Sequence, residues 1–341
     1  MGLAGIIGLL SLGALVFGGY AALVQAGANS TDAGRRAVWA QLAEKRGGEY
    51  LDEKRPFWST ERRDQLDLRV GSAVVRVDVR ITGFGKSKEA YTRARARFTL
   101  GRGPAFHVAP AGALASVGRA LGAQDLPLGH QRFDRDFIVK GQDHAGVKRA
   151  WTPALQATLT RSLSDATVTS RGDMVELSLS GARYFGVDVM ADVVGALASV
   201  GADALDALAA ALPDATLTRA GGTWDAPTPP SLTVPTAQGD VTALVRWFTG
   251  GPRVILALPV TRELPEFRVV IADGHAEGIP QGLLSEYGAR LLVELPGVLV
   301  ASKERHLELR WLGIPEASTF MCGVNLLAEL AGRVHHTGAF R

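Results

Sequence analysis

The chain has 341 residues, of which 47% are hydrophobic, and a formal net charge of +3. This length is typical of about two domains, and the apolar content is sufficient for packed cores. The single cysteine, Cys322, excludes an intramolecular disulfide and a zinc site built from several cysteines.

The charge is divided unevenly along the chain. Residues 26–150 carry 23 Lys and Arg against 14 Asp and Glu, whereas residues 151–341 carry 14 against 20. A basic half that follows an apolar N-terminus suits an anionic lipid surface. Nucleic acid is not favoured as a partner, because the basic residues form no dense block and no nucleic-acid motif occurs. Ordinary surface asymmetry is the alternative reading.

The N-terminal segment, residues 3–26, carries no charge. As a helix it would be about 36 Å long, enough to cross a hydrocarbon core of about 30 Å. The sequence therefore predicts a single transmembrane helix. Basic residues follow it, first at Arg35 and Arg36, and predict that the C-terminal body lies in the cytoplasm. A cleaved signal peptide, with a periplasmic or exported body, is the alternative.

Small residues recur every four positions along this expected span, at Ala14, Gly18, Ala22 and Ala26. Stripes of this kind let two helices approach closely in lipid. They form a candidate face for a homodimer through the membrane helix.

The soluble part begins with an expected helix that Thr31 caps and that ends at Gly47-Gly48. Period-two alternation then predicts strands at 74–81, 91–100 and 105–110. Further strands are expected at 137–140 and 174–181. Helices are expected at 111–121, after Thr152-Pro153, at 189–197 and at 205–212.

Residues 219–236 contain four prolines and two glycines, which predicts a linker or an extended segment. Residues 152–181 align without a gap to residues 284–313, with Leu159 on Leu291 and Gly181 on Gly313. The alignment predicts two copies of one unit in which strands come first and helices after.

The expected fold class is α+β: an N-terminal transmembrane helix followed by two tandem, degenerate α+β repeats, in which antiparallel strands pack with helices. The predicted domains are the transmembrane helix (1–30), a juxtamembrane helix and connector (31–60), the first unit (61–215), a Pro-rich linker (216–236) and a shorter second unit (237–341).

Gly85-Lys86-Ser87 matches the last three letters of a phosphate-binding loop. That motif also needs a glycine seven residues before the serine, where this chain has Arg80, and a helix afterwards. The next segment alternates as a strand does, so a hairpin connection is expected, and no cofactor is predicted.

The histidines show no metal-binding spacing, and no catalytic residue is assigned. Asp143 and Asp273 each lie before an expected helix and are expected to be caps. Cys322 is expected to be buried, and His335-His336 to lie in a terminal tail.

Arginines on neighbouring strands are the strongest functional feature of the sequence. Alternation places Arg93, Arg95 and Arg97 on one face of a strand, with Arg76 and Arg80 on the strand expected beside it. This face is a candidate site for anionic lipid headgroups or an acidic partner. A solvated sheet face crossed by salt bridges is the alternative.

Residues 133–153 have the form F-x3-F-x-V-x3-D-x8-TP. The segment resembles an uncharacterised family of bacterial membrane-anchored proteins, a domain of unknown function. The stretch 85–93 is similar to a hairpin of the same family. The resemblance implies a cytoplasmic α+β domain behind an N-terminal membrane segment, anchored at a bacterial inner membrane. It implies no activity, cofactor or site residue.

Together these features predict a single-pass, membrane-anchored, non-enzymatic interaction or scaffold protein with an unknown protein partner. An enzyme with a site in the cleft between the two repeats is one alternative, and an exported envelope- or lipid-binding protein is another.

Overall fold

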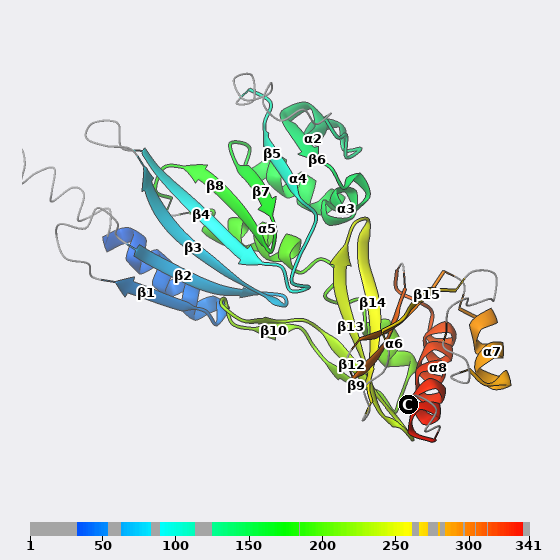
Figure 1. The fold of residues 1–341 in the computed structure, drawn as a ribbon. Helices are drawn as coiled ribbons and strands as arrows, with labels where there is room; N and C mark the ends of the chain where they lie inside the picture. Colours follow the sequence, from blue (N-terminus) through cyan, green and yellow to red (C-terminus); the bar gives the residue numbers. More distant parts are fainter. Residues whose placement is uncertain are drawn as a thin grey trace, which may run out of the picture.

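A computed structural model describes residues 33–336, apart from 54–62, 83–88, 113–124, 184, 261–265, 272–278, 280–283, 296, 304 and 312. Within these residues the chain is mostly β-structure, arranged as two large antiparallel sheets with helices (Figure 1). The two sheets lie side by side, and β13 and β14 of the second sheet stand nearest the first unit (Figure 1).

The first sheet has eight strands in the order β1-β2-β3-β4-β8-β7-β5-β6. The strands are β1 (Glu49–Glu53), β2 (Arg63–Val70), β3 (Ala73–Thr82), β4 (Glu89–Arg97), β5 (Phe106–Pro110), β6 (Phe137–Gly141), β7 (Thr167–Arg171) and β8 (Met174–Ser180). The helices of this unit are a helix at 33–46, α2 (Gln131–Asp136), α3 (His144–Ala150), α4 (Pro153–Ser162) and α5 (Val187–Ala198).

One face of this sheet is packed against helices. Val75 and Val77 of β3 are fully buried, as is Val194 of α5, and all three belong to the core of the first unit. Trp39 brings the helix at 33–46 into the same core. Because strand side chains alternate, the polar residues between these valines point to the opposite face.

The second sheet has seven strands in the order β15-β16-β17-β14-β13-β12-β9. The strands are β9 (Thr216–Thr218), β12 (Ser231–Thr236), β13 (Gly239–Phe248), β14 (Gly251–Pro259), β15 (Arg268–Val270), β16 (Leu299–Lys303) and β17 (His306–Arg310). The helices are α6 (Asp206–Ala211), α7 (Glu286–Val293) and α8 (Ala317–His336). Phe320 and Leu327 of α8 are fully buried in a separate core with Val245 and Leu256.

The two sheets follow the same order of strands. Leaving β6 aside, β1-β2-β3-β4-β8-β7-β5 corresponds position by position to β9-β12-β13-β14-β17-β16-β15. In the first unit α4 precedes the β7–β8 hairpin and α5 follows it. In the second unit α7 precedes the β16–β17 hairpin and α8 follows it. The aligned stretches 152–181 and 284–313 therefore hold the same elements, as an internal duplication predicts.

The expected fold class needs correction. In the part of the chain that the structure describes, no helix is both long and apolar enough to cross a membrane. The fold class is therefore corrected to two mostly β units with helices, and no transmembrane helix is part of the described fold. The segment at 1–30, with Ala14, Gly18, Ala22 and Ala26, lies outside the described residues, as does Thr31.

The division into units also differs from the predicted one. Leu205 and Leu208, expected in the first unit, are buried in the second core. For residues 219–236, expected as a linker or an extended segment, the structure shows the extended form: β12 is a strand of the second sheet, as is β9 just before this stretch. Between them β10 (Gly221–Gly222) and β11 (Pro227–Thr228) form a two-stranded ribbon. This ribbon reaches β3 of the first sheet (Figure 1).

Several predicted elements are confirmed. Strands occur at β3, β4, β5, β6 and β8, and Thr152 caps α4 with Pro153 at its first position. The expected helix at 111–121 falls almost wholly outside the described residues. Strand β1 and helix α2 were not predicted because they are brief. Strand β2 was missed although Leu66, Leu68 and Val70 alternate with polar residues.

Candidate interaction surface

The five predicted arginines lie on the face of the first sheet that points away from its helices. Arg76 and Arg80 belong to β3, and Arg93, Arg95 and Arg97 to β4. The strands pair antiparallel, with Arg76 opposite Arg95 and Asp78 opposite Arg93. No helix among the described residues packs on this surface, which we call the polar face.

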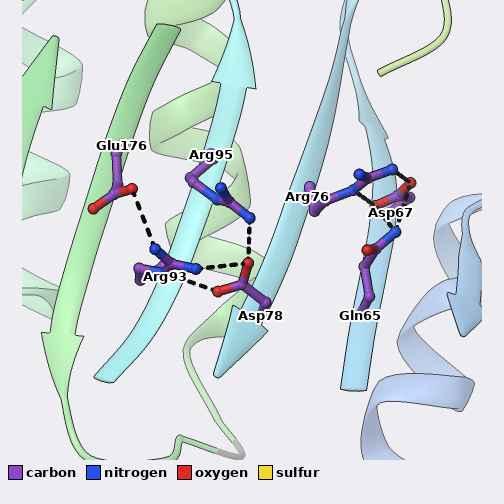
Figure 2. A network of polar contacts seen from close by, with 7 residues as sticks. All are labelled: Gln65, Asp67, Arg76, Asp78, Arg93, Arg95 and Glu176. Atoms are coloured by element: carbon purple, nitrogen blue, oxygen red, sulfur yellow. Dashed lines mark hydrogen bonds and ion pairs between the residues drawn. The ribbon is translucent and has the colours of Figure 1, made fainter. Parts of the chain in front are cut away.

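Asp78 is the centre of the polar face (Figure 2). Arg93 donates to both of its carboxylate oxygens, from Nε at 2.8 Å and Nη2 at 3.1 Å, and Arg95 donates to Oδ2. Arg93 also lies 3.9 Å from the Glu176 carboxylate on β8. The Asp78 side chain is only 12% exposed, so water screens this charge cluster weakly.

A second ion pair lies on the neighbouring strand. Arg76 donates to Asp67 of β2 through Nε at 2.9 Å and Nη2 at 2.8 Å, and Gln65 lies beside both (Figure 2). This two-pronged geometry is the strongest that Arg makes with a carboxylate. The hydrogen bonds to Asp67 raise the pKa of Arg76 above its ordinary value.

The register brings two like charges together, since Arg76 and Arg95 are direct cross-strand partners. Such pairs are destabilising unless other groups compensate them. Here Asp67 lies on one side of the pair, Asp78 beside it and Glu176 opposite Arg95 on β8. The three arginines and three carboxylates drawn in Figure 2 balance in formal charge.

Trp224, from the turn of the β10–β11 ribbon, packs on the same arginines. Its ring lies 4.7 Å from the guanidinium carbon of Arg76 and 5.7 Å from that of Arg95. Contacts of a guanidinium with an indole face are attractive and grow stronger as water is removed. The segment expected as a linker thus places an aromatic residue over the centre of the polar face.

The remaining two arginines lie toward opposite ends of the strands. Arg97 forms an ion pair with Asp173, and both side chains are partly exposed. Arg80 is exposed and has no hydrogen-bond or ion-pair partner among the described residues. Four of the five candidate arginines are therefore held by carboxylates.

The polar face continues across the sheet to β5. His107 is the cross-strand partner of Thr169 on β7 and of Lys140 on β6. Burial, and then the positive charges of Arg171 and Lys140, lower the pKa of His107 below its ordinary value. The ring is therefore uncharged near neutral pH.

Sequence reasoning missed the partners of the arginines. Asp67 and Glu176 lie on strands other than those of the arginines, and Trp224 comes from the presumed linker. The sequence did place Asp78 on the same face of β3 as Arg76 and Arg80, because these residues are two positions apart. The register that brings the other partners close is not visible in one sequence.

The family-like motif at 133–153 forms a packing and capping cluster. Phe133 stacks on Phe137 at 5.1 Å between ring centroids and lies 5.7 Å from Trp151. Asp143 caps α3, as predicted, by accepting from the Gly146 amide at 3.0 Å. Its second oxygen accepts from the Gly250 amide in the second unit, also at 3.0 Å.

Other candidate residues differ from expectation. Cys322, expected to be buried, is instead half-buried and packs against the second core. His335 and His336 are the last residues of α8 and not part of a tail. His130 is the N-cap of α2, with Nδ1 accepting from the Phe133 amide at 3.2 Å. Asp273 lies outside the described residues.

Two clefts lie between the units. One, of about 730 Å³, is bordered by the turn at Gly71 and by Arg149, Asp203, Asp206 and Arg219. The other, of about 740 Å³, is bordered by residues 99–105, Gln142, Asp143, two ribbon prolines and the end of β13. Neither cleft has a histidine among its described lining residues. Within the described ranges, no three His, Cys, Asp or Glu residues gather as a metal site would require.

Comparisons with known proteins give little further information. No protein-family model and no curated protein matches the chain. One solved structure, the crystal structure of the mycobacterial trehalose monomycolate transport factor A, TtfA, matches with 11% identity and a TM-score of 0.33. The match covers 49% of this chain and 93% of that one. At this TM-score the likeness supports no conclusion about this chain.

Proposed function

We propose that the protein is a non-enzymatic interaction or scaffold protein that binds a protein partner on the polar face. The observation that carries the proposal is the set of arginines held by carboxylates on a sheet face that no described helix covers, with Trp224 packed on them. Arg and Trp are enriched in protein–protein interfaces, where isolated charges are depleted. Removing water from a surface costs less free energy when the charges on that surface already form ion pairs.

A protein partner is favoured over anionic lipid. Attraction to lipid headgroups needs positive charge that is not compensated nearby. Here an approaching anionic surface would meet Asp67, Asp78 and Glu176 together with the arginines. A lipid-binding face, predicted from the sequence, therefore has less support than a face that binds a protein whose surface carries both charges.

The enzyme alternative has less support for a different reason. Asp143 is the carboxylate that lines the larger cleft, and both of its oxygens accept backbone N–H groups. An acid or base must instead reach the proton that it transfers. Asp143 therefore has a structural role, and the larger cleft is better suited to binding than to proton transfer.

Photo-crosslinking in cells that produce the full-length chain tests the proposal. The photoreactive residue p-benzoylphenylalanine replaces Arg171, an exposed residue at the end of β7 on the polar face. The control places it at Ala154, an exposed residue of α4 on the helical side of the sheet. We expect one protein adduct of defined mass from position 171 and none from position 154.

The same experiment provides the contradicting outcome. If position 171 gives no adduct, or if both positions give the same adducts, the polar face is not the partner site. Adducts with lipid alone at position 171 would support binding of the polar face to anionic lipid and refute the protein partner.

A further inference from the structure

The larger of the two clefts between the units combines positive charge with an apolar wall. It is lined by the β4–β5 connection, by Gln142 and Asp143, by the ribbon and by residues 246–249 of the second unit. Its volume of about 740 Å³ lies within the usual range for small-molecule sites. Both units and the ribbon contribute, so the cleft exists only when the units are assembled.

Two arginines at the cleft form no ion pair with a described residue. Arg102 comes from the first unit and Arg246 from the second, and both side chains are exposed. Neither has a hydrogen bond or an ion pair with any described residue. Arg253 lies directly across from Arg246 on β14 and adds a third positive charge nearby.

The carboxylate in the cleft offsets only one of these two positive charges. Asp143 caps α3 and also accepts from the Gly250 amide, so backbone donors hold its oxygens and the lining residues keep a surplus of one positive charge. The second cleft differs, because two arginines and two aspartates border it: Arg149, Arg219, Asp203 and Asp206. A surplus of positive charge among the lining residues distinguishes the larger cleft.

Apolar side chains form part of the wall of the larger cleft. Pro227 of β11 and Pro229, just after it, line the cleft together with Trp247 and Phe248 at the end of β13. Trp247 is 7% exposed and belongs to the second core, which makes this wall rigid. Rigid apolar walls with a few placed charges are the usual composition of small-molecule sites.

We propose that this cleft binds a small molecule with one anionic group on an apolar body. Arg102 and Arg246 bind the anion, and the prolines and Phe248 contact the apolar part. A carboxylate, sulfonate or phosphate fits equally, because a guanidinium binds each through charge-assisted hydrogen bonds. The inference is independent of the partner proposed for the polar face.

Two fluorescent probes test this on the full-length protein. Anilinonaphthalene sulfonate carries one sulfonate on an aromatic body, and N-phenylnaphthylamine has the same body without charge. We expect saturable binding of the sulfonate. Changing Arg102→Gln and Arg246→Gln together should weaken it at least about tenfold, because a hydrogen bond to a charged group contributes about 1.5–3 kcal/mol. Binding of the neutral probe should change less than about twofold.

Arg149→Gln with Arg219→Gln in the other cleft is the matched control, and it should leave sulfonate binding within about twofold of the unchanged protein. All four arginines are exposed, so their replacement should not disturb folding. Decanoate and decyl phosphate, added as competitors, separate carboxylate from phosphate preference. The proposal is overturned if the sulfonate does not saturate, if the Arg102 and Arg246 changes have no effect, or if the control weakens binding as much.

Discussion

At the scale of single residues, Asp78 is the group on which the polar face depends. Its nearly buried carboxylate accepts from two arginines, and one of these faces a third arginine across the strands. Without Asp78, the charges of Arg93 and Arg95 would lie close together with little water between them. Removing one partner of such a cluster is costly because the other charges stay where they are.

Asp78→Asn should therefore lower the free energy of unfolding by about 2 kcal/mol, less than a fully buried pair because the arginines are partly exposed. Denaturant unfolding of the full-length protein measures it. Asp165→Asn removes a pair with Arg183 in which both side chains are largely exposed, and it should change the stability by less than about 0.5 kcal/mol. Equal effects of the two changes would refute the central role of Asp78.

At the scale of elements, α5 packs closely on one face of the first sheet, and the polar face is the opposite one. Gly195 of α5 lies so near Val70 of β2 that a Cβ there would approach the valine Cβ to 2.4 Å. Glycine ordinarily weakens a helix by about 1 kcal/mol relative to alanine. Here its lack of a side chain allows the helix to lie flat on β2.

Gly195→Ala should destabilise the protein by about 1–3 kcal/mol, because overpacking outweighs the gain in helix propensity. Gly332→Ala in α8 is the matched control, since a Cβ there meets only the Gln238 side chain at 3.4 Å or more. We expect it to be neutral or to stabilise by up to about 1 kcal/mol. Thermal unfolding of both variants measures the difference, and a stabilised Gly195→Ala variant would contradict the close packing.

At the scale of the whole molecule, the two units are joined by a few specific contacts between their separate cores. Asp143 links α3 to the Gly250 amide, Trp224 lies on Arg76 and Arg95, and Leu100 of the first unit is buried in the second core. Both clefts lie between these contacts, so their shape depends on how firmly the units are held.

Asp143→Ala should loosen this connection and remove the cap of α3, a loss of about 1 kcal/mol from the cap alone. Hydrogen exchange of the peptide that contains Gly250 should become faster, because its amide loses its acceptor. Thr152→Ala removes the cap of α4, a hydrogen bond within the first unit, so exchange at Gly250 should not change. Unaltered exchange at Gly250 in the Asp143 variant would show that this hydrogen bond does not hold the units together.

The sequence by itself determined the elements whose signals are local. Alternation identified β3 and β4 and the side to which each arginine points, and Thr152-Pro153 and Asp143 marked helix starts. These features depend on residues within a few positions of each other, so one sequence contains them. The transmembrane helix, read from apolarity alone, is not among the elements of the described chain.

Only the tertiary structure decided what the arginines contact. Pairing of β4 with β8 brings Glu176 to Arg93, and the β10–β11 ribbon brings Trp224 to Arg76. These partners are far apart in the chain, and strand register sets their contacts. The same packing turned a predicted basic face into one where carboxylates hold four of the five arginines, and it placed Arg102 and Arg246 at one cleft. Periodicity fixes the side of a strand on which a residue lies, whereas assembly of the sheets fixes its neighbours.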